Sequence, residues 1–358
     1  MFKLINNWLN RHFSDPQVVI LGTILVMGSL MIFAFGNMLT PVFTAIIIAY
    51  LLEGFVMMGE RMKIPRIIAV IAVFSIFMTI LLILTVVLFP LLSHQIGQFL
   101  QQLPSMIATG QKELMRLPEK YPDILSQQQL KLIIESIGNE LTSLFQQIFS
   151  LSLASVRGAI SLLIYLVLVP LLVFFFLKDK KMLISWFTDL LPKESELAYR
   201  VWHEVNIQTG NYIRGKIWEL CIVWGVTYVT FIYFKLQFSM LLALFVGLSV
   251  IIPFIGATVM FVPVALIAYF QWGWSSDFVS IMVALSIIQI LDGNLLSPLL
   301  LSEVVNLHPV AIIVAVLVFG GLFGIVGLFF AIPLATLVHS IMKAWTDHQL
   351  NEAKNARN

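Results

Sequence analysis

The sequence predicts an all-α membrane protein, a polytopic bundle of about eight spanning helices with a broken or re-entrant hairpin and a small helical insert outside the membrane. Hydrophobic residues make up 59% of the 358 residues and charged residues only 11%. Soluble domains contain about 25% charged residues. The apolar residues gather in runs close to the ~20 residues that a helix needs to cross a bilayer. Proline and glycine interrupt several runs, which is typical of helices that break inside a membrane protein.

Composition also limits the classes of function. A formal net charge of +2 is too small to indicate a nucleic-acid partner. Cys221 is the only cysteine, so disulfides and cysteine-ligated metal sites are excluded. The six histidines are not spaced as metal ligands, and no glycine-rich phosphate loop is present. We therefore expect no metal, no cofactor and no enzymatic activity.

The N-terminal part begins with a basic amphipathic stretch over residues 1–16, which is expected at the membrane surface. It lacks the apolar core and cleavage site of a signal peptide. Gly36-Asn37 predicts a turn between the first two of three spans, and the third span is unusually long. Glu53 lies close to the basic loop 61–66 and is interpreted as an acid that reaches the interface. The predicted spans are Val18–Phe35, Leu39–Met58 and Ile67–Leu92.

Composition changes after the third span. Residues 93–150 are rich in glutamine and charge, and an apolar stripe at helical spacing predicts a small helical module there. A fourth span, Leu151–Leu177, leads to a polar segment over 178–216 with the repeat of an amphipathic helix. The chain therefore alternates between membrane and water on both sides of the fourth span.

The motif NYIRGK, Asn211–Lys216, leads into the fifth span, Ile217–Phe234. Glu219 lies one helical turn into that span and is expected to pair with Lys216 or Arg214. We interpret this cytoplasmic motif as structural, because a carboxylate near the membrane needs a partner.

Residues 236–276 carry no charge, and Pro253, Gly256 and Pro263 divide them into two halves of about 15 residues. Each half is short for a full span. A re-entrant or kinked hairpin and two complete crossings are both compatible with this pattern.

The next segment carries the candidate transport site. Asp292 is the only formal charge between Phe278 and Leu301, and Gly293, Asn294 and Pro298 follow it. A carboxylate at bilayer depth costs at least ~2.5 kcal/mol, so it normally faces protein or water. We expect a broken helix in which Asp292 carries a proton or binds a cation and Asn294 bonds the solute. A structural hinge, in which the acid caps a half-helix, is the alternative.

The chain then passes through a polar link, in which Glu303 and Asn306 complete the predicted substrate- or ion-binding set. A final hairpin, Val310–Phe319 and Leu322–Ile341, has glycines at its turn that favour close helix packing over a ligand role. The positions predicted to break helices or to gate are Pro253, Gly256, Pro263, Gly293, Pro298, Pro309, Gly320, Gly321, Gly324, Gly327 and Pro333.

The distribution of basic residues predicts the orientation. The N-terminus, the 60–66 loop, the 178–216 segment and the tail carry most of the lysines and arginines, which places both termini in the cytoplasm and the insert outside. The predicted divisions are 1–92, 93–150, 151–177, 178–216, the break-rich transport region 217–345 and the tail 346–358.

These features favour a secondary transporter for a small polar solute or a cation. The absence of an ATPase motif and the lone membrane acid suggest coupling to a proton or sodium gradient. A passive oligomeric channel and a membrane scaffold that recruits partners are the alternatives.

Several stretches resemble the autoinducer-2 exporter family (AI-2E transporters) over nearly the whole chain. They are AYLLE, IYLVLVP, FFFLKDK, NYIRGK, IPFIGA, DGNLLSPLLLSEVVNLHP and FGGLFGIVGLFFAIPLA. The resemblance implies a multi-pass protein of the bacterial inner membrane with about seven or eight helices. It implies export of a small signalling molecule or sodium/proton exchange. It also implies a homo-oligomer, with a pentamer as one form.

Overall fold

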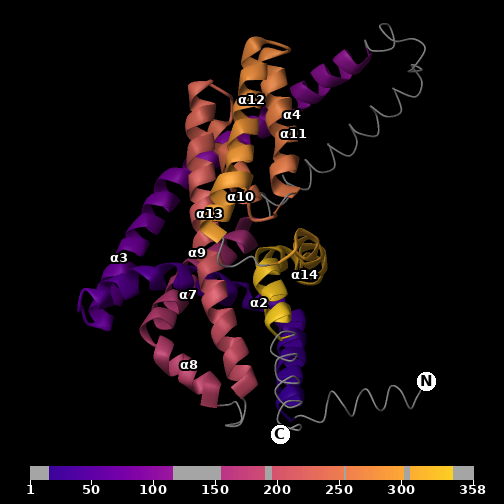
Figure 1. Cartoon of the computed structure of the whole chain (residues 1–358). Helices are drawn as coiled ribbons and strands as arrows, with labels where there is room; N and C mark the ends of the chain where they lie inside the picture. The colour runs from indigo at the N-terminus through magenta and orange to yellow at the C-terminus, as the bar shows by residue number, and fades with distance from the viewer. Residues whose placement is uncertain (1–15, 116–154, 190–195, 254, 302–306, 342–358) are drawn as a thin grey trace, which may run out of the picture.

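The protein is all-helical, as predicted (Figure 1). No strand occurs in the part of the chain that the computed structural model describes, which is residues 16–115, 155–189, 196–253, 255–301 and 307–341. Five helical stretches in this part are long and apolar enough to cross a membrane, and four shorter apolar helices accompany them. The five stretches are Met38–Arg61, Arg66–Lys112, His203–Tyr233, Ile255–Trp272 and Ser276–Leu301. The expected total of about eight spans stays a prediction.

The first described helix, α2, is one continuous element of 46 residues, Pro16–Arg61. The predicted turn at Gly36-Asn37 was therefore wrong. The Thr40 hydroxyl donates to the Gly36 carbonyl oxygen at 3.1 Å, within the same helical repeat. Inside a membrane no water replaces broken backbone hydrogen bonds. An apolar segment therefore stays helical even through residues that favour turns in soluble proteins.

The third predicted span is longer than expected. Helix α3 (Arg66–Ile83) passes through a π-helical turn, η1 (Leu84–Leu88), into α4 (Phe89–Met115) without a break. At a rise of ~1.5 Å per residue this rod is roughly 75 Å long, against a hydrocarbon core of ~30 Å. Residue 93, the expected start of the polar insert, lies inside α4.

Helix α7 (Ser155–Lys178) matches the fourth predicted span and is followed by the short helix α8 (Lys180–Asp189). Helix α9 (Glu196–Tyr233) has 38 residues and runs through the expected boundary between a surface segment and the fifth span. The motif NYIRGK therefore lies in the middle of one long helix.

The next two helices form a hairpin whose open ends lie together. Helix α10 (Ser239–Ser249) has 11 residues, roughly 16 Å of length, which is too short to cross. The chain reverses before α11 (Ile255–Trp272). The Gln271 side chain ties the open ends together, since its Oε1 accepts from the Gln237 N–H at 2.7 Å and its Nε2 donates to the Lys235 carbonyl oxygen at 2.8 Å. The short α10 fits a re-entrant hairpin, whereas α11 is among the helices long enough to cross a membrane, so both alternatives stay predictions.

The arms of this hairpin meet at a glycine. A Cβ atom on Gly256 would lie 1.7 Å from the Ser249 carbonyl oxygen, which no side chain can tolerate. Helix α10 is well buried, with six of its eleven residues inside the protein. Close backbone contact thus fixes the position of the hairpin tip.

Helix α12 (Ser276–Leu291) continues through a π-helical turn, η2 (Asp292–Leu296), into α13 (Ser297–Leu301). The expected break at Asp292 is therefore replaced by a widened turn within a continuous helix. Pro298 follows this turn directly, and because it has no backbone N–H it cannot donate the hydrogen bond that a regular helix would have at this position. π-Helical turns of this kind are frequent at functional sites.

The final described hairpin reverses at Gly324. Helix α14 (Pro309–Phe329) contains non-helical angles at Gly324, with φ 60° and ψ −139°, and a helix over Ala331–Ile341 follows. A Cβ atom on Gly327 would lie 1.9 Å from the Phe319 carbonyl oxygen. The predicted role in close packing fits Gly327 and Gly320, whereas open space surrounds Gly321 and Gly324, and Gly324 instead provides the positive φ of the turn.

We predict that Gly256→Ala destabilises the protein by about 1–3 kcal/mol, because the added methyl overpacks a backbone contact that cannot relax. Gly225→Ala is the matched control, since open space surrounds Gly225 in the middle of α9. Thermal unfolding of the purified variants in detergent measures the difference. Equal melting temperatures for the two variants would show that the hairpin arms can move apart without loss of stability.

Candidate functional site

A cavity of about 550 Å³ lies where α9, the tip of the α10–α11 hairpin, the α12–η2–α13 helix and the final hairpin meet. Its apolar wall includes Ile252, Ile312 and Ile332, so both hairpins contribute to it. Its polar and helix-bending residues are Lys216, Glu219, Pro253, Gln289, Asp292, Gly293, Ser297 and Pro298. Volumes of ~300–1,000 Å³ are typical of small-molecule sites.

Helix α9 contributes a buried ion pair. The Lys216 Nζ atom donates to Glu219 Oε2 at 2.8 Å, and the two residues are 3% and 1% exposed. The predicted pairing of Glu219 is thus confirmed, and Lys216 is the partner. Gly215 allows α9 to approach α13, since a Cβ atom there would lie 2.6 Å from the Leu300 carbonyl oxygen. This close approach brings the ion pair to the Asp292 turn.

Asp292 begins the π-helical turn and lines the cavity. The residue is buried, and its Oδ1 atom has no hydrogen-bond partner among the described residues. Its charge interacts unfavourably with Glu219 and favourably with Lys216. The site therefore contains two carboxylates and one ammonium group within mutual electrostatic range.

Gln289 is a site residue that the sequence analysis missed. It lies one helical turn before Asp292 on the same face of the helix, and it also lines the cavity. Both Nε2 and Oε1 of its amide are buried without a partner among the described residues. A lone glutamine in the apolar run SIIQIL was the available signal. Buried polar atoms without partners cost free energy, so a polar solute or water is expected to bind here.

The other predicted residues lie in different places. Asn294 is exposed and its Nδ2 donates to the Ile290 carbonyl oxygen at 2.9 Å, so the expected contact with a solute in this cavity is not supported. Arg214 bonds Asn211 Oδ1 at 2.7 Å and does not line the cavity. Glu303 and Asn306 lie outside the described residues.

Of the predicted helix-breaking positions, Pro253, Gly293 and Pro298 line the cavity. The other predicted helix-breaking positions do not line the cavity and fall into two groups. Gly256 and Pro263 belong to α11. The remainder belong to the final hairpin, and these are Pro309, Gly320, Gly321, Gly324, Gly327 and Pro333.

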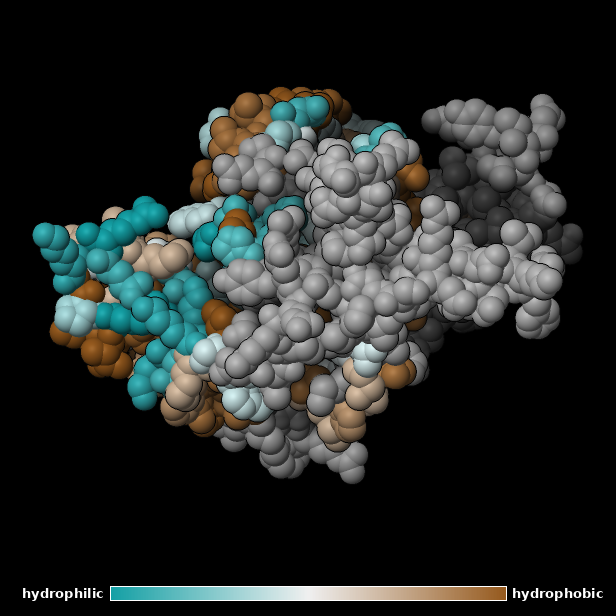
Figure 2. All heavy atoms as spheres, turned by 60° about the horizontal axis from the view of Figure 1, so that its bottom comes forward, coloured by the Kyte–Doolittle hydropathy of each residue, from teal (hydrophilic) through white to brown (hydrophobic). Residues whose placement is uncertain are grey.

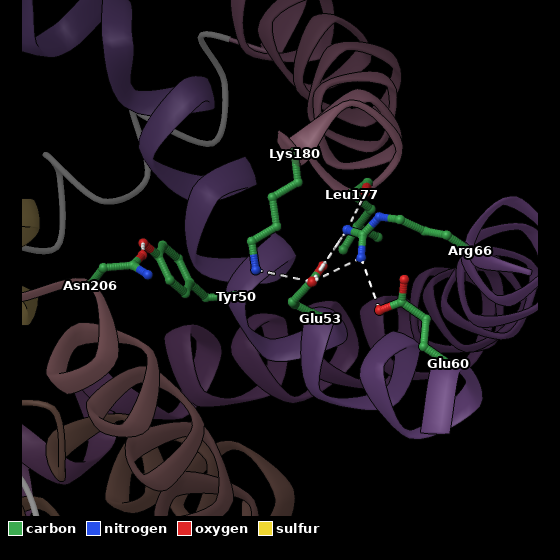
Figure 3. Close-up of polar contacts among 7 residues, drawn as sticks. All are labelled: Tyr50, Glu53, Glu60, Arg66, Leu177, Lys180 and Asn206. Atoms are coloured by element: carbon green, nitrogen blue, oxygen red, sulfur yellow. Dashed lines mark hydrogen bonds and ion pairs between the residues drawn. The ribbon is translucent and has the colours of Figure 1, made fainter. Parts of the chain in front are cut away.

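A second polar cluster joins α2, α3 and α7 (Figure 3). The Arg66 guanidinium contacts Glu53 at 2.9 Å and Glu60 at 3.2 Å, and it donates to the Leu177 carbonyl oxygen at 2.7 Å. The Lys180 ammonium is a second cation beside Glu53, with Nζ 3.0 Å from Oε1. Glu53 thus pairs with the basic loop near which the sequence placed it.

We predict that Lys216→Met costs about 3–5 kcal/mol of stability, because it leaves the Glu219 charge buried and unpaired near Asp292. The double variant Lys216→Met/Glu219→Met is expected to recover most of this loss. Glu204→Gln, which changes an exposed acid on the same helix, is the control. Unfolding temperatures in detergent test this. A double variant as unstable as the single one would argue against a mutual pair.

Comparisons with known proteins identify the family of this chain. The profile described as AI-2E family transporter matches residues 21–347. The chain is 41% identical over 350 residues to PerM of Escherichia coli (strain K12), which is named as a permease, and the match covers 98% of this chain and 99% of PerM. It is 25% identical to YrrI of Bacillus subtilis (strain 168), which is named as a transport protein, with 84% of each chain covered. The chain belongs to the AI-2E transporter family.

Proposed function

We propose that this protein is a secondary transporter of the bacterial inner membrane that carries a small polar solute or a cation through the Asp292 cavity, with export as its direction. Family membership supports transport by a multi-pass membrane protein. The distribution of basic residues supports cytoplasmic termini.

One observation carries the assignment of the site. Asp292 Oδ1 and both polar atoms of the Gln289 amide are buried without partners among the described residues, yet they belong to residues that line a cavity of about 550 Å³. A folded protein does not normally leave three such atoms unsatisfied. A solute with hydroxyl groups, or a hydrated cation, offers donors and acceptors that complete them.

The charges of the cavity favour uptake of one positive charge. Glu219 and Asp292 face the single ammonium of Lys216, and Lys216 already bonds Glu219. A proton or a monovalent cation on Asp292 balances the remaining negative charge. Because the proton and the cation compete for the same carboxylate, their binding is coupled, which is the requirement for exchange between two gradients.

The two hairpins supply the moving parts of the proposal. Pro253 at the tip of the α10–α11 hairpin lines the cavity, and the final hairpin adds Ile312 and Ile332 from its two arms. Broken helices at such a site are typical of secondary transporters. Movement of either tip would change which side of the membrane reaches Asp292. The homo-oligomer, with a pentamer as one form, is proposed from the family resemblance and contributes nothing to this cavity.

We predict that Asp292→Asn leaves insertion and folding intact but abolishes pH-dependent flux. The measurement uses proteoliposomes with an internal pH-sensitive dye and an imposed sodium gradient, followed by external acid steps. Asp277→Asn is the matched control, because it makes the same change at the exposed start of the same helix. Unchanged flux in Asp292→Asn removes this carboxylate from the mechanism, and steady single-channel currents in the wild type indicate a passive channel.

We also predict that cation binding weakens with acid. Sodium at about 100 times its dissociation constant raises stability by roughly 2.7 kcal/mol if it binds only the folded protein. This thermal shift is expected to shrink as pH falls, since protons occupy the same carboxylate, and to be absent in Asp292→Asn. A panel of diols and small sugars in the same assay identifies the solute class. A sodium shift independent of pH would contradict competition at Asp292.

A further inference from the structure

A second pocket, separate from the transport cavity, lies between α2, α7, α8 and α9. It encloses about 270 Å³. Its walls are mostly apolar, with Ile46, Phe176 and Leu183 among them. Four polar side chains line it as well, Tyr50, Glu53, Lys180 and Asn206. This volume lies just below the ~300 Å³ that is typical of small-molecule sites, which favours a narrow apolar occupant such as one hydrocarbon chain.

The polar side chains of the pocket are held in pairs by hydrogen bonds (Figure 3). The Tyr50 hydroxyl donates to Asn206 Oδ1, which joins α2 to α9. Lys180 reaches Glu53 across the pocket, but Glu53 is already held by two nitrogen atoms of Arg66. Glu53 therefore keeps a partner if the Lys180 ammonium turns toward another anion.

The surroundings of the pocket are basic. Near this end of α2, α3 and α7 the chain has six basic residues and three acidic ones, namely Arg61, Lys63, Arg66, Lys178, Lys180 and Lys181 and Glu53, Glu60 and Asp179. Lys178 and Lys181 are exposed. Figure 2 shows hydrophilic side chains gathered on the side of the molecule that carries α8 and the turn between α2 and α3. The surplus is positive, so an anionic group is favoured here.

Helix α8 indicates the depth of the pocket in the membrane. Its lysines, Lys180 and Lys181, occupy its first turn, while Met182 and Trp186 are 66% and 59% exposed. A short helix with basic residues and exposed apolar and aromatic side chains is typical of the membrane interface. The mouth of the pocket thus lies at the level of lipid headgroups.

From these observations we propose that the pocket binds an anionic phospholipid. Its headgroup phosphate contacts Lys180 and Lys181, and one acyl chain occupies the apolar space beside Ile46 and Leu183. A soluble anion would leave the apolar walls unused, and a zwitterionic lipid would leave the surplus positive charge unbalanced.

Native mass spectrometry of the delipidated full-length protein tests the proposal. Dioleoyl-phosphatidylglycerol is compared with dioleoyl-phosphatidylcholine, which has the same chains. We expect the anionic lipid to bind about ten-fold or more tightly, because each lysine near the headgroup adds to its attraction. The double variant Lys180→Gln/Lys181→Gln is expected to remove this preference, and Ile46→Trp to weaken binding of both lipids by filling the chain site.

Lys235→Gln is the matched control, since Lys235 is exposed at the opposite end of α9, and it should bind both lipids as the wild type does. Leu183→Trp fills the same pocket from α8 and replaces Ile46→Trp if that variant fails to fold. Equal affinity for the two lipids overturns the proposal. Full retention of phosphatidylglycerol in the folded pocket-filling variants overturns it as well, as does equally strong binding of glycerol 3-phosphate.

Discussion

One ammonium group set against two carboxylates in a buried site is the constraint around which the structure is arranged. Lys216 and Glu219 are almost fully buried, and Asp292 joins them at the edge of a cavity. Charges in a low-dielectric interior are costly unless they are paired and hydrogen-bonded. Among the described residues this set lacks one positive partner, and the four structural units around the cavity leave the imbalance in place. In a protein that had only to be stable, a second lysine or an apolar residue would occupy this position.

Close backbone contacts make that geometry possible. Gly215 brings α9 against α13, Gly256 joins the arms of the α10–α11 hairpin, and Gly327 joins the arms of the final one. Any side chain at these positions would push the cavity walls apart. The π-helical turn at Asp292 has a related effect, because it aims the carboxylate inward while the helix continues. The positions of the charged side chains therefore depend on close backbone contacts between uncharged groups.

Much of this arrangement could be predicted from sequence, for definable reasons. The all-helical class, the reversal between α10 and α11 and the pairing of Glu219 follow from hydropathy, from Pro253 with Gly256, and from i,i+3 spacing. The turn at Gly36-Asn37 was wrong because turn propensities come from proteins in water. Asn294 was chosen for its nearness to Asp292 in the chain, but a residue two positions on points to another side of a helix. Gln289, three positions back, shares the face of Asp292. That Lys216 and Glu219 lie beside Asp292 could not be predicted, since their proximity depends on tertiary packing.

The length of α10 has an electrical consequence. Its 11 residues reach only about halfway through the hydrocarbon layer, and the tip that follows them opens on a polar cavity. In the proposed transporter, water that reaches this cavity would thin the insulating part of the membrane here, and the resting voltage would fall mainly across that thin part. An ion that crosses it exchanges ~2.3 kcal/mol per elementary charge for each 100 mV. A single short helix thus determines where along the path electrical work is done.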